Sequence, residues 1–300
     1  MNEAVATVRS FNRTVTERVG ALRDHYLGRD RPLGEARVLW EIGDGGCEVR
    51  ALRRRLGLDS GYLSRLLQSL EAAELVTVAS ADSDWRVRAV QLTKRGRAEW
   101  ALLDRRSDAL ARSMLESLSD SQRERLVSAM AEVEQLLTAA LIQIDVVDPA
   151  DARAAYCLGE YFAELDARFD TGFDPADSLP ADSQDMRLPA GLFLLATLRG
   201  EPVGCGALKL HGARPAELKR MWVSPSARGL GVGRRLLSEL ERRAAEHGAR
   251  VIRLETNKTL VEAVSMYRSA GYREVEAFND EPFADHWFEK RLTSTRRARR

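Results

Sequence analysis

The sequence predicts two domains: a mainly helical domain with one β-hairpin, then a domain of mixed strands and helices. Three observations predict this division. The chain has 300 residues, which is long for a single compact core. Helical periodicity surrounds one pair of alternating strands in the first half, whereas strands and helices alternate in the second half. The composition, 44% apolar and 30% charged, is that of an ordinary globular protein. We expect the domains to cover residues 1–143 and 144–300.

Membrane and metal-binding classes are not indicated. No apolar run approaches the roughly 20 residues of a membrane span, and the first residues lack the apolar core of a signal peptide. We therefore expect a cytoplasmic protein without a membrane partner. Cys47, Cys157 and Cys205 are far apart and the four histidines do not cluster, so neither a disulfide framework nor a metal site is expected.

Charge is unevenly distributed along the chain, although the formal net charge is only +1. Residues 50–97 hold ten Lys or Arg against five Asp or Glu, a local net charge of +5. Residues 145–190 hold eleven acids against three arginines, a local net charge of −8. This asymmetry predicts an anionic partner for the first segment and a different one for the second.

The first half begins and ends with long helical patterns. Residues 3–27 and about 99–143 show helical periodicity, and three shorter helices are expected near residues 34–43, 48–56 and 60–73. The last of these has Asp59 or Ser60 as its predicted N-cap.

The predicted helix at 60–73 has one apolar and one polar face. Its leucines follow helical spacing and must face inward; they are Leu63, Leu66, Leu67 and Leu70. The opposite face presents polar, small or aromatic residues, which are Gly61, Tyr62, Ser64, Arg65, Gln68 and Ser69. Such a face suits the major groove of DNA.

Two alternating β-runs follow at residues 75–96, joined by a polar turn, and predict a hairpin with Arg86 and Arg88 near its tip. Arginines there suit phosphates or a minor groove. One amphipathic helix with an arginine is ordinary surface in most proteins. The order helix, helix, helix, hairpin, long helix is much more specific, and it predicts a winged helix-turn-helix.

Residues 5–143 resemble the MarR family of winged-helix regulators. The stretch LGLDSGYLSRLLQSLEAAELVTV carries the resemblance, and Asp84, Arg86 and Leu92-Thr93 match the family's wing pattern. Trp85 departs from it, because the family usually has a further basic residue there. The resemblance implies a homodimer formed by the terminal helices, residues 3–27 and 119–143, on pseudo-palindromic double-stranded operator DNA. The implied DNA-binding residues are Gly61, Tyr62, Ser64, Arg65, Gln68, Arg86 and Arg88.

The second half predicts α/β or α+β architecture. Strands are expected at residues 141–149, 191–200, 202–211, 216–225, 251–257, 272–278 and 286–292. Helices are expected at residues 150–169, 233–249 and 261–271. A Pro- and Asp-rich loop at 170–189 should cover the acceptor side of a site. Its acids suit a cationic amine, and Arg168 suits a carboxylate, but neither interpretation outranks an ordinary solvated acidic loop.

A glycine-rich loop, PSARGLGVGRRLL, joins the strand at 216–225 to the next helix. Gly229, Gly231 and Gly233 do not match a dinucleotide fingerprint, because the third glycine comes one residue early. The Gly-Lys-Ser/Thr of a P-loop is absent. The remaining pattern is R-x-x-G-x-G, formed by Arg228, Gly231 and Gly233. Glycines let a backbone approach a pyrophosphate, and a helix N-terminus offers free N–H groups.

Residues 143–292 resemble the GNAT superfamily of acetyl-CoA-dependent N-acetyltransferases. The segments ELKRMWVSPSARGLGVGRRLL and LETN…AVSMYRSAGYREV carry the resemblance. It implies acetyl-CoA as co-substrate, no metal, and Tyr267 as a general acid beside the sulfur. Many members have an asparagine where Leu260 stands, and Asn257 is the nearest replacement. The implied cofactor-binding residues are Met221, Trp222, Val223, Arg228, Gly229, Leu230, Gly231, Val232, Gly233, Arg234 and Asn257.

Acetyl transfer to an amine needs a neutral nucleophile and a proton for the leaving thiolate. Some related enzymes have a glutamate base at the position of Glu217. Strict alternation places Glu217, Lys219, Met221 and Val223 on one strand face, together with the CoA-facing residues. The alternatives are an exposed edge carboxylate for Glu217 and an ordinary core aromatic for Tyr267.

The sequence therefore predicts a DNA-binding regulator that acetylates a small-molecule amine. One alternative is a sensor, in which the second domain binds acetyl-CoA or another effector without turnover. Another is a plain acetyltransferase that uses its first domain only to dimerise.

Overall fold

The computed structural model describes residues 2–22, 25–81, 84–179, 182–212 and 214–292, with no side-chain description for residues 81–87. The chain divides into two compact units, Met1–Met130 and Ala131–Arg300. The division falls within one helix, α6 (Asp120–Ala139). The boundary expected at residue 143 lies after this helix and stays a prediction.

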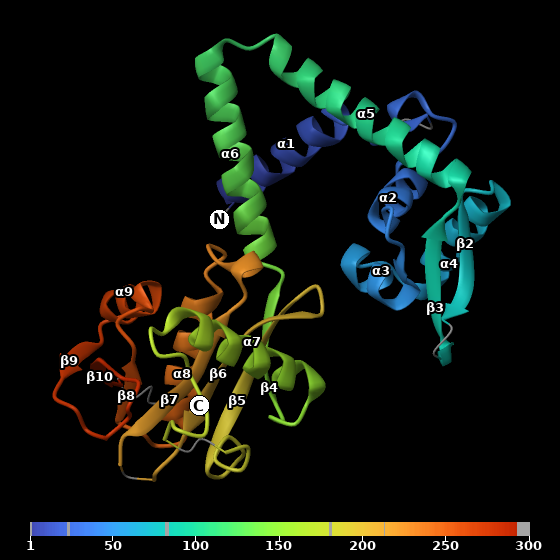
Figure 1. Ribbon diagram of the computed structural model, residues 1–300. Helices are drawn as coiled ribbons and strands as arrows, with labels where there is room; N and C mark the ends of the chain where they lie inside the picture. Colours follow the sequence, from blue (N-terminus) through green and yellow to red (C-terminus); the bar gives the residue numbers. More distant parts are fainter. Residues whose placement is uncertain (1, 23–24, 82–83, 180–181, 213, 293–300) are drawn as a thin grey trace, which may run out of the picture. The chain divides into compact units, whose positions relative to one another are not determined.

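The first unit has helices around a small sheet (Figure 1). Its helical elements are α1 (Asn2–Arg18), the 3-10 turn η1 (Tyr26–Gly28), α2 (Leu33–Ile42), α3 (Val49–Leu56), α4 (Ser60–Ala72), α5 (Lys94–Glu116) and the first part of α6. Its antiparallel strands lie in the order β1 (Cys47–Glu48), β3 (Asp84–Leu92) and β2 (Val76–Ala81). The predicted order of helices and hairpin is confirmed.

The long helical patterns end earlier than predicted. Helix α1 stops at Arg18, close to Gly20, whose left-handed backbone (φ 67°) ends a helix without strain. The pattern expected over 99–143 is interrupted between α5 and α6. Ser119 begins a new helix there through a capping box: its backbone N–H donates to Gln122 Oε1 at 3.0 Å, and its hydroxyl accepts from the Gln122 N–H at 3.4 Å.

Helix α4 has the two faces that its sequence predicts. Leu63, Leu66, Leu67 and Leu70 are all buried in the core of the first unit. Asp59 is the N-cap, and its carboxylate accepts from the backbone N–H of Tyr62 at 2.8 Å. The helix is therefore fixed from its inner side, which leaves the outer side free for a partner.

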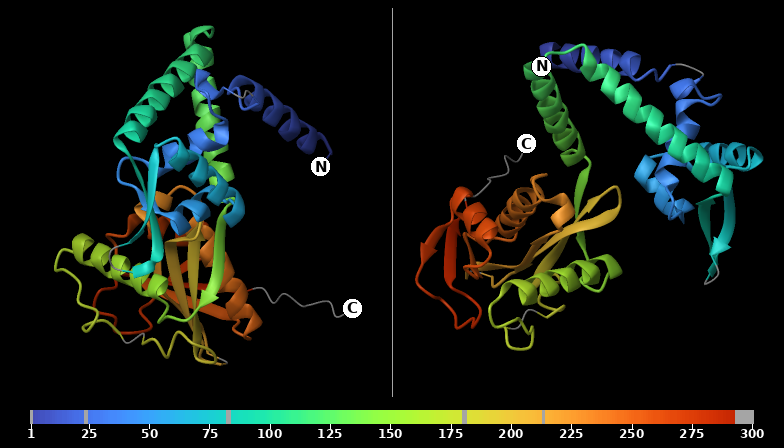
Figure 2. Two further views of the ribbon diagram at one scale, coloured as in Figure 1. Left: turned by 90° about the vertical axis from the view of Figure 1, so that its right-hand side faces the viewer. Right: turned by 45° about the horizontal axis from the view of Figure 1, so that its top comes forward.

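The second unit is a seven-stranded sheet with helices on both faces. The strand order is β4 (Ile142–Val147), β5 (Gly191–Leu198), β6 (Glu201–Lys209), β7 (Ala216–Val223), β8 (Val251–Thr256), β10 (His286–Arg291) and β9 (Arg273–Val275). Its helices are α7 (Ala152–Arg168), η2 (Pro225–Ala227), α8 (Val232–Glu246) and α9 (Val261–Ser269). Helices α7 and α8 bury their apolar sides in different clusters, on opposite faces of the sheet (Figure 2).

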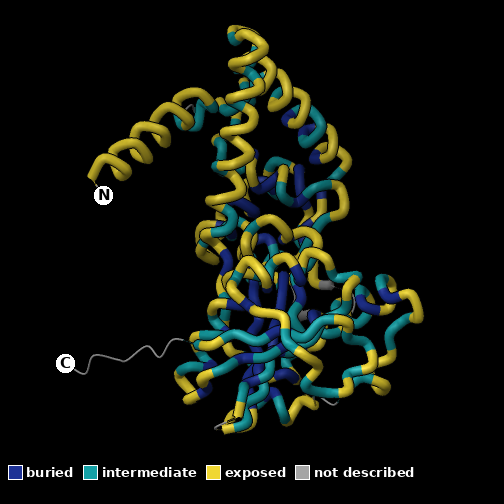
Figure 3. Tube along the Cα trace, turned by 90° about the vertical axis from the view of Figure 1, so that its left-hand side faces the viewer, coloured by how far each residue is buried: buried dark blue, intermediate teal, exposed yellow. Residues whose placement is uncertain are grey.

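Buried residues follow the central strands of this sheet, whereas α1 and most of α6 are exposed (Figure 3). Tyr267 and Val264 of α9 join the cluster that α8 covers. The exposed helices carry apolar side chains, which are Val5, Val8, Phe11 and Val15 on α1 and Val127, Met130, Leu136 and Leu137 on α6.

Strand β7 contains a β-bulge that changes its side-chain alternation. Its pairing with β6 shifts register so that Arg220 and Met221 stand opposite Gly206 alone. Leu218 before the bulge and Val223 after it consequently pack on the same face. Trp222 packs on the opposite face.

The expectation that Glu217 and Lys219 share a face with Met221 and Val223 is therefore wrong. The extra residue in the β7 bulge shifts the side-chain alternation by one position. Glu217 and Lys219 therefore point to the opposite face of the sheet from Met221 and Val223.

Strands β7 and β8 are parallel neighbours that pair only near their starts. Ala216 pairs with Ile252 and Glu217 with Arg253, and no further pair joins them within the described strands. Beyond these pairs the two strands diverge. The residues at their diverging ends line the cavities described next.

Candidate functional site

The glycine turn at residues 228–234 connects β7 to α8. Gly229 (φ 82°) and Gly231 (φ 74°) adopt left-handed backbone conformations that a side chain disfavours. Gly231 is the N-cap of α8, and because it has no side chain, it leaves the first N–H groups of the helix uncapped. The sequence therefore needs glycine at both positions to turn from strand to helix.

The turn exposes a set of unpaired backbone N–H groups. Within the described chain, no acceptor is found for the amides of Gly229, Gly231, Val232, Gly233 and Arg234. Several of them belong to the first turn of α8, where helix geometry supplies no partner. Unpaired amides at the positive end of a helix dipole form an anion-binding site.

A cavity of about 530 Å³ lies against this turn, and we name it the large cavity. Most predicted cofactor-binding residues line it: Met221, Trp222, Val223, Arg228, Gly229, Gly231, Val232, Gly233 and Arg234. Leu230 packs instead against the core under α8. Helices α7 and α9 supply the remaining walls.

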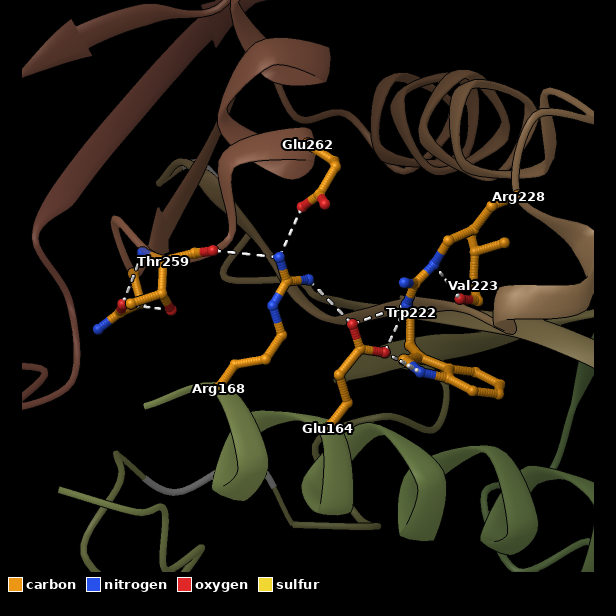
Figure 4. Close-up of polar contacts among 8 residues, drawn as sticks. Glu164, Arg168, Trp222, Val223, Arg228, Thr259 and Glu262 are labelled. Atoms are coloured by element: carbon orange, nitrogen blue, oxygen red, sulfur yellow. Dashed lines mark hydrogen bonds and ion pairs between the residues drawn. The ribbon is translucent and has the colours of Figure 1, made fainter. Parts of the chain in front are cut away.

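Glu164 of α7 is the centre of a polar network at the large cavity (Figure 4). Its carboxylate accepts hydrogen bonds from Arg228 at 2.6 and 2.7 Å, from Trp222 Nε1 at 2.9 Å and from Arg168 at 3.0 Å. Arg168 also donates to Glu262 of α9 at 2.8 Å. The charge of Arg228 is thus neutralised by Glu164 in this structure.

A smaller cavity of about 90 Å³, the small cavity, lies at the diverging ends of β7 and β8. The two cavities are adjacent, since five residues line both: Tyr161, Leu165, Met221, Leu260 and Ala263. The small cavity is therefore placed to hold a second molecule next to one end of a ligand in the large cavity.

Tyr267 lines the small cavity from α9. The residue is only 4% exposed. Burial raises its pKa above the ordinary value of tyrosine, and the nearby Tyr161 and Glu255 act in the same direction. The phenol therefore keeps its proton at neutral pH, as a general acid must.

Glu217 lies beside other titratable side chains. Its carboxylate is 3.2 Å from His211 Nε2 and 3.7 Å from Lys219 Nζ. Among the described residues that line the two cavities, Glu217 is absent. Its role as a base stays a prediction.

Asn257 lines the small cavity and holds its walls together. The side-chain N–H₂ donates to the Phe283 carbonyl at 2.8 Å. The side-chain oxygen accepts from the Thr259 N–H at 2.9 Å and from its hydroxyl at 2.8 Å. These bonds occupy the amide, so Asn257 orders the segment before α9.

The small cavity is also lined by residues that the sequence did not point to, among them Tyr161, Arg220 and Glu255. Glu255 is paired with Lys219 and has a side chain 8% exposed. Alternation along β8 places it opposite the buried Leu254. No sequence signal points to Arg220, because the bulge that directs it depends on pairing between two strands.

The predicted DNA-binding residues of α4 share its outer surface. Gly61, Tyr62, Arg65 and Gln68 are exposed, and Ser64 is half-buried. The Arg65 guanidinium lies 5.7 Å from the centre of the Tyr62 ring. On the hairpin, Arg88 is exposed, whereas the side chain of Arg86 lies outside the described residues.

No helix in the described part of the chain is both long and apolar enough to span a membrane. Within the same residues, no group of three or more His, Cys, Asp or Glu side chains is arranged to hold a metal ion.

Two family models match separate parts of the chain. The Acetyltransferase (GNAT) family matches residues 159–272, and the MarR family matches residues 28–86. The chain is also similar to an IAA acetyltransferase of Azospirillum brasilense, with 38% identity over 92 residues. The match covers 30% of this chain and 60% of that relative, so it spans less than two thirds of the relative's length.

Solved structures resemble each half of the chain. An acetyltransferase of the GNAT family from Staphylococcus aureus Mu50 is 21% identical, with a TM-score of 0.43, and covers 50% of this chain and 100% of its own. FabT of Streptococcus pneumoniae, solved in complex with DNA, is 22% identical, with a TM-score of 0.37, and covers 45% of this chain and 94% of its own.

Proposed function

Since the chain joins a MarR-family winged-helix domain to a GNAT acetyltransferase domain, we propose that it is a DNA-binding transcriptional regulator that transfers acetyl from acetyl-CoA to a small-molecule amine. The observation that carries the enzymatic part is the pair of adjacent cavities. One meets an anion-binding turn, and the other holds a protonated tyrosine. We also propose a cytoplasmic location.

The large cavity fits acetyl-CoA. Free amides of the glycine turn suit a pyrophosphate. The approach to Gly231 is open, because a methyl group added there would meet no other atom within 4 Å. When bound, acetyl-CoA supplies an acetyl thioester, which an amine can attack. The chain's own residues then have to orient the amine and move two protons.

Proton movement is assigned to the small cavity. The amide C–N bond forms while the thioester C–S bond breaks; the amine loses a proton and the sulfur gains one. Tyr267 donates the second proton. For the first, Glu217 stays the prediction from sequence, whereas Glu255 lines the cavity itself and is the acceptor that the geometry favours.

The DNA-binding part uses the outer face of α4 and the hairpin. The arginines there provide the positive charge that phosphates and base edges require. Replacing Arg65 and Arg86 together by alanine should abolish the shift of upstream genomic fragments in a gel. Retained binding in this double variant would contradict the proposal, as would failure of the wild type on every such fragment.

A homodimer completes the proposal. The apolar side chains of α1 and α6 are exposed in the single chain, and a second copy would cover them. Phe11→Glu should convert a dimer to a monomer in light scattering, while a Leu22→Glu control, outside α1, should not. A wild-type monomer at micromolar concentration would contradict this part.

A sensor without turnover is the alternative, and one observation favours it. Gln135 Nε2 of α6 donates to the Gly229 carbonyl at 2.5 Å. Arg235 of α8 also donates to the carbonyls of Ala139 and Ile142 at 2.7 and 2.8 Å. The glycine turn is thus tied to the helix that crosses the boundary between the units.

Tyr267→Phe separates the two functions. Loss of acetylation with unchanged acetyl-CoA binding supports catalysis. Sensing is supported if the wild type releases no CoA thiol with any amine and Tyr267→Phe leaves the effect of acetyl-CoA on DNA binding unchanged.

A further inference from the structure

Arg220 brings to the small cavity a positive charge that no carboxylate of the described chain neutralises. Comparable cations nearby are paired, Lys219 with Glu255 and Arg228 with Glu164. Arg220 is half-buried, and the ion pairs formed by the described Asp and Glu side chains around it involve Lys219 and Arg228 instead. A guanidinium does not lose its charge in proteins, so this position favours an anionic group of a ligand.

The backbone and two aromatic rings hold Arg220 in place. Its φ of 56° is in the left-handed region, which is unfavourable for a residue with a side chain. The β7 bulge imposes this conformation. The guanidinium carbon lies 4.9 Å from the centre of the Phe162 ring and 6.0 Å from that of Tyr161. A side-chain hydrogen bond with Tyr161 uses part of the guanidinium edge, and packing on ring faces leaves the remaining N–H groups able to form paired hydrogen bonds.

The other side chains that line the small cavity either have hydrogen-bond partners of their own or are apolar. Glu281 accepts from the Ser178 hydroxyl and the Leu179 N–H, both at 3.0 Å. Phe173 and Phe283, with ring centres 4.8 Å apart, form an apolar wall. The cavity thus combines one available cation with an apolar surface.

We propose that the acetyl acceptor carries a carboxylate that Arg220 binds through two parallel hydrogen bonds, which makes the acceptor an amino acid with an apolar side chain. This inference rests on the proposed acetyl transfer. The carboxylate of the acceptor stays unchanged in the reaction. The amine nitrogen forms the amide bond and passes its proton to Glu255. The C–S bond breaks, and the sulfur takes the proton of Tyr267. A small cavity requires amine and carboxylate to be close together, as they are in an amino acid.

The test compares each apolar L-amino acid with its own amide as acceptor, measured by CoA thiol release from the full chain. For the wild type, kcat/KM should be roughly 10- to 100-fold higher for the carboxylate than for the amide, as expected for charge-assisted hydrogen bonds. In Arg220→Gln this preference should fall to about 3-fold or less, with the KM for acetyl-CoA unchanged. Arg220→Lys, which keeps the charge, should retain part of the preference.

Arg199→Gln is the matched control, since Arg199 is an exposed arginine with a similar backbone (φ 53°) in the β5–β6 turn. It should keep the full preference. Equal rates for amino acid and amide, with turnover intact, would overturn the inference and leave acetyl transfer standing. If no acceptor releases thiol, the proposed transfer fails. In that case, calorimetry measures the affinities of the amino acids and their amides for the wild type and for Arg220→Gln. Equal affinities in the two proteins would overturn the inference.

Discussion

Tyr161 and Tyr267 line the small cavity with phenols that resist ionisation. Burial raises the pKa of Tyr161 to about 12, against the lowering effect of the Arg220 charge, and raises that of Tyr267 as well. Both groups therefore stay protonated at any pH at which acetyl transfer would be assayed. The small cavity therefore contains a proton donor, which the proposed acetyl transfer requires.

These raised pKa values predict a loss of stability in alkali. The unfolded chain releases its phenol protons near about pH 10, whereas the folded chain keeps them to higher pH. Above about pH 10 the unfolded state binds fewer protons, so the free energy of unfolding should fall as pH rises toward about 12 and be unaffected below 10. Urea unfolding from pH 8 to 11 should show a shallower fall in Tyr161→Phe and Tyr267→Phe. A slope equal to that of the wild type would contradict the assignment.

Glu255 and Glu217 are the two candidates for the general base. Because Glu255 lines the small cavity and Glu217 does not, Glu255→Gln should lower kcat roughly 100- to 10,000-fold, as loss of a general base does. Glu217→Gln should change kcat by about 3-fold or less. Both variants lose one carboxylate near Lys219, so they are matched. The reverse order would support the sequence-based prediction for Glu217.

The helices and turns that the sequence predicted correctly are those whose pattern depends on residues close together in the chain. The leucine spacing of α4 identified its buried face, and the glycines identified the turn before α8. The β7 bulge depends instead on the register between two strands, with Gly206 facing two residues. Arg220 could not be selected for that reason, and Glu217 was assigned to the wrong strand face.

The network around Glu164 predicts an effect on donor binding. Glu164 neutralises Arg228 beside the anion-binding turn, so Glu164→Gln should free the guanidinium and lower the KM for acetyl-CoA about 3- to 10-fold. Glu239→Gln is the control, because Glu239 pairs with Arg242 and Arg243 on α8. A KM that rises in Glu164→Gln would show that the network is needed to shape the cavity.

For the whole molecule, helix α6 is the element shared by the two units. If ligand binding at the glycine turn acts through the Gln135–Gly229 hydrogen bond, acetyl-CoA should change the Kd for operator DNA about 5-fold or more, as in typical allosteric coupling. Gln135→Ala should reduce this change while leaving DNA binding without acetyl-CoA intact. Fluorescence anisotropy with and without acetyl-CoA measures both. A full response in the variant would exclude this hydrogen bond as the connection.

We propose that this chain both binds DNA and carries a working acetyltransferase site. The most direct test incubates the full chain with acetyl-CoA and a broad panel of amines and amino acids, and measures both CoA thiol release and the acetylated product by mass spectrometry. We predict acceptor-dependent release in the wild type and a loss of roughly 100-fold or more in Tyr267→Phe. A wild type that binds acetyl-CoA but acetylates no member of the panel would contradict the claim.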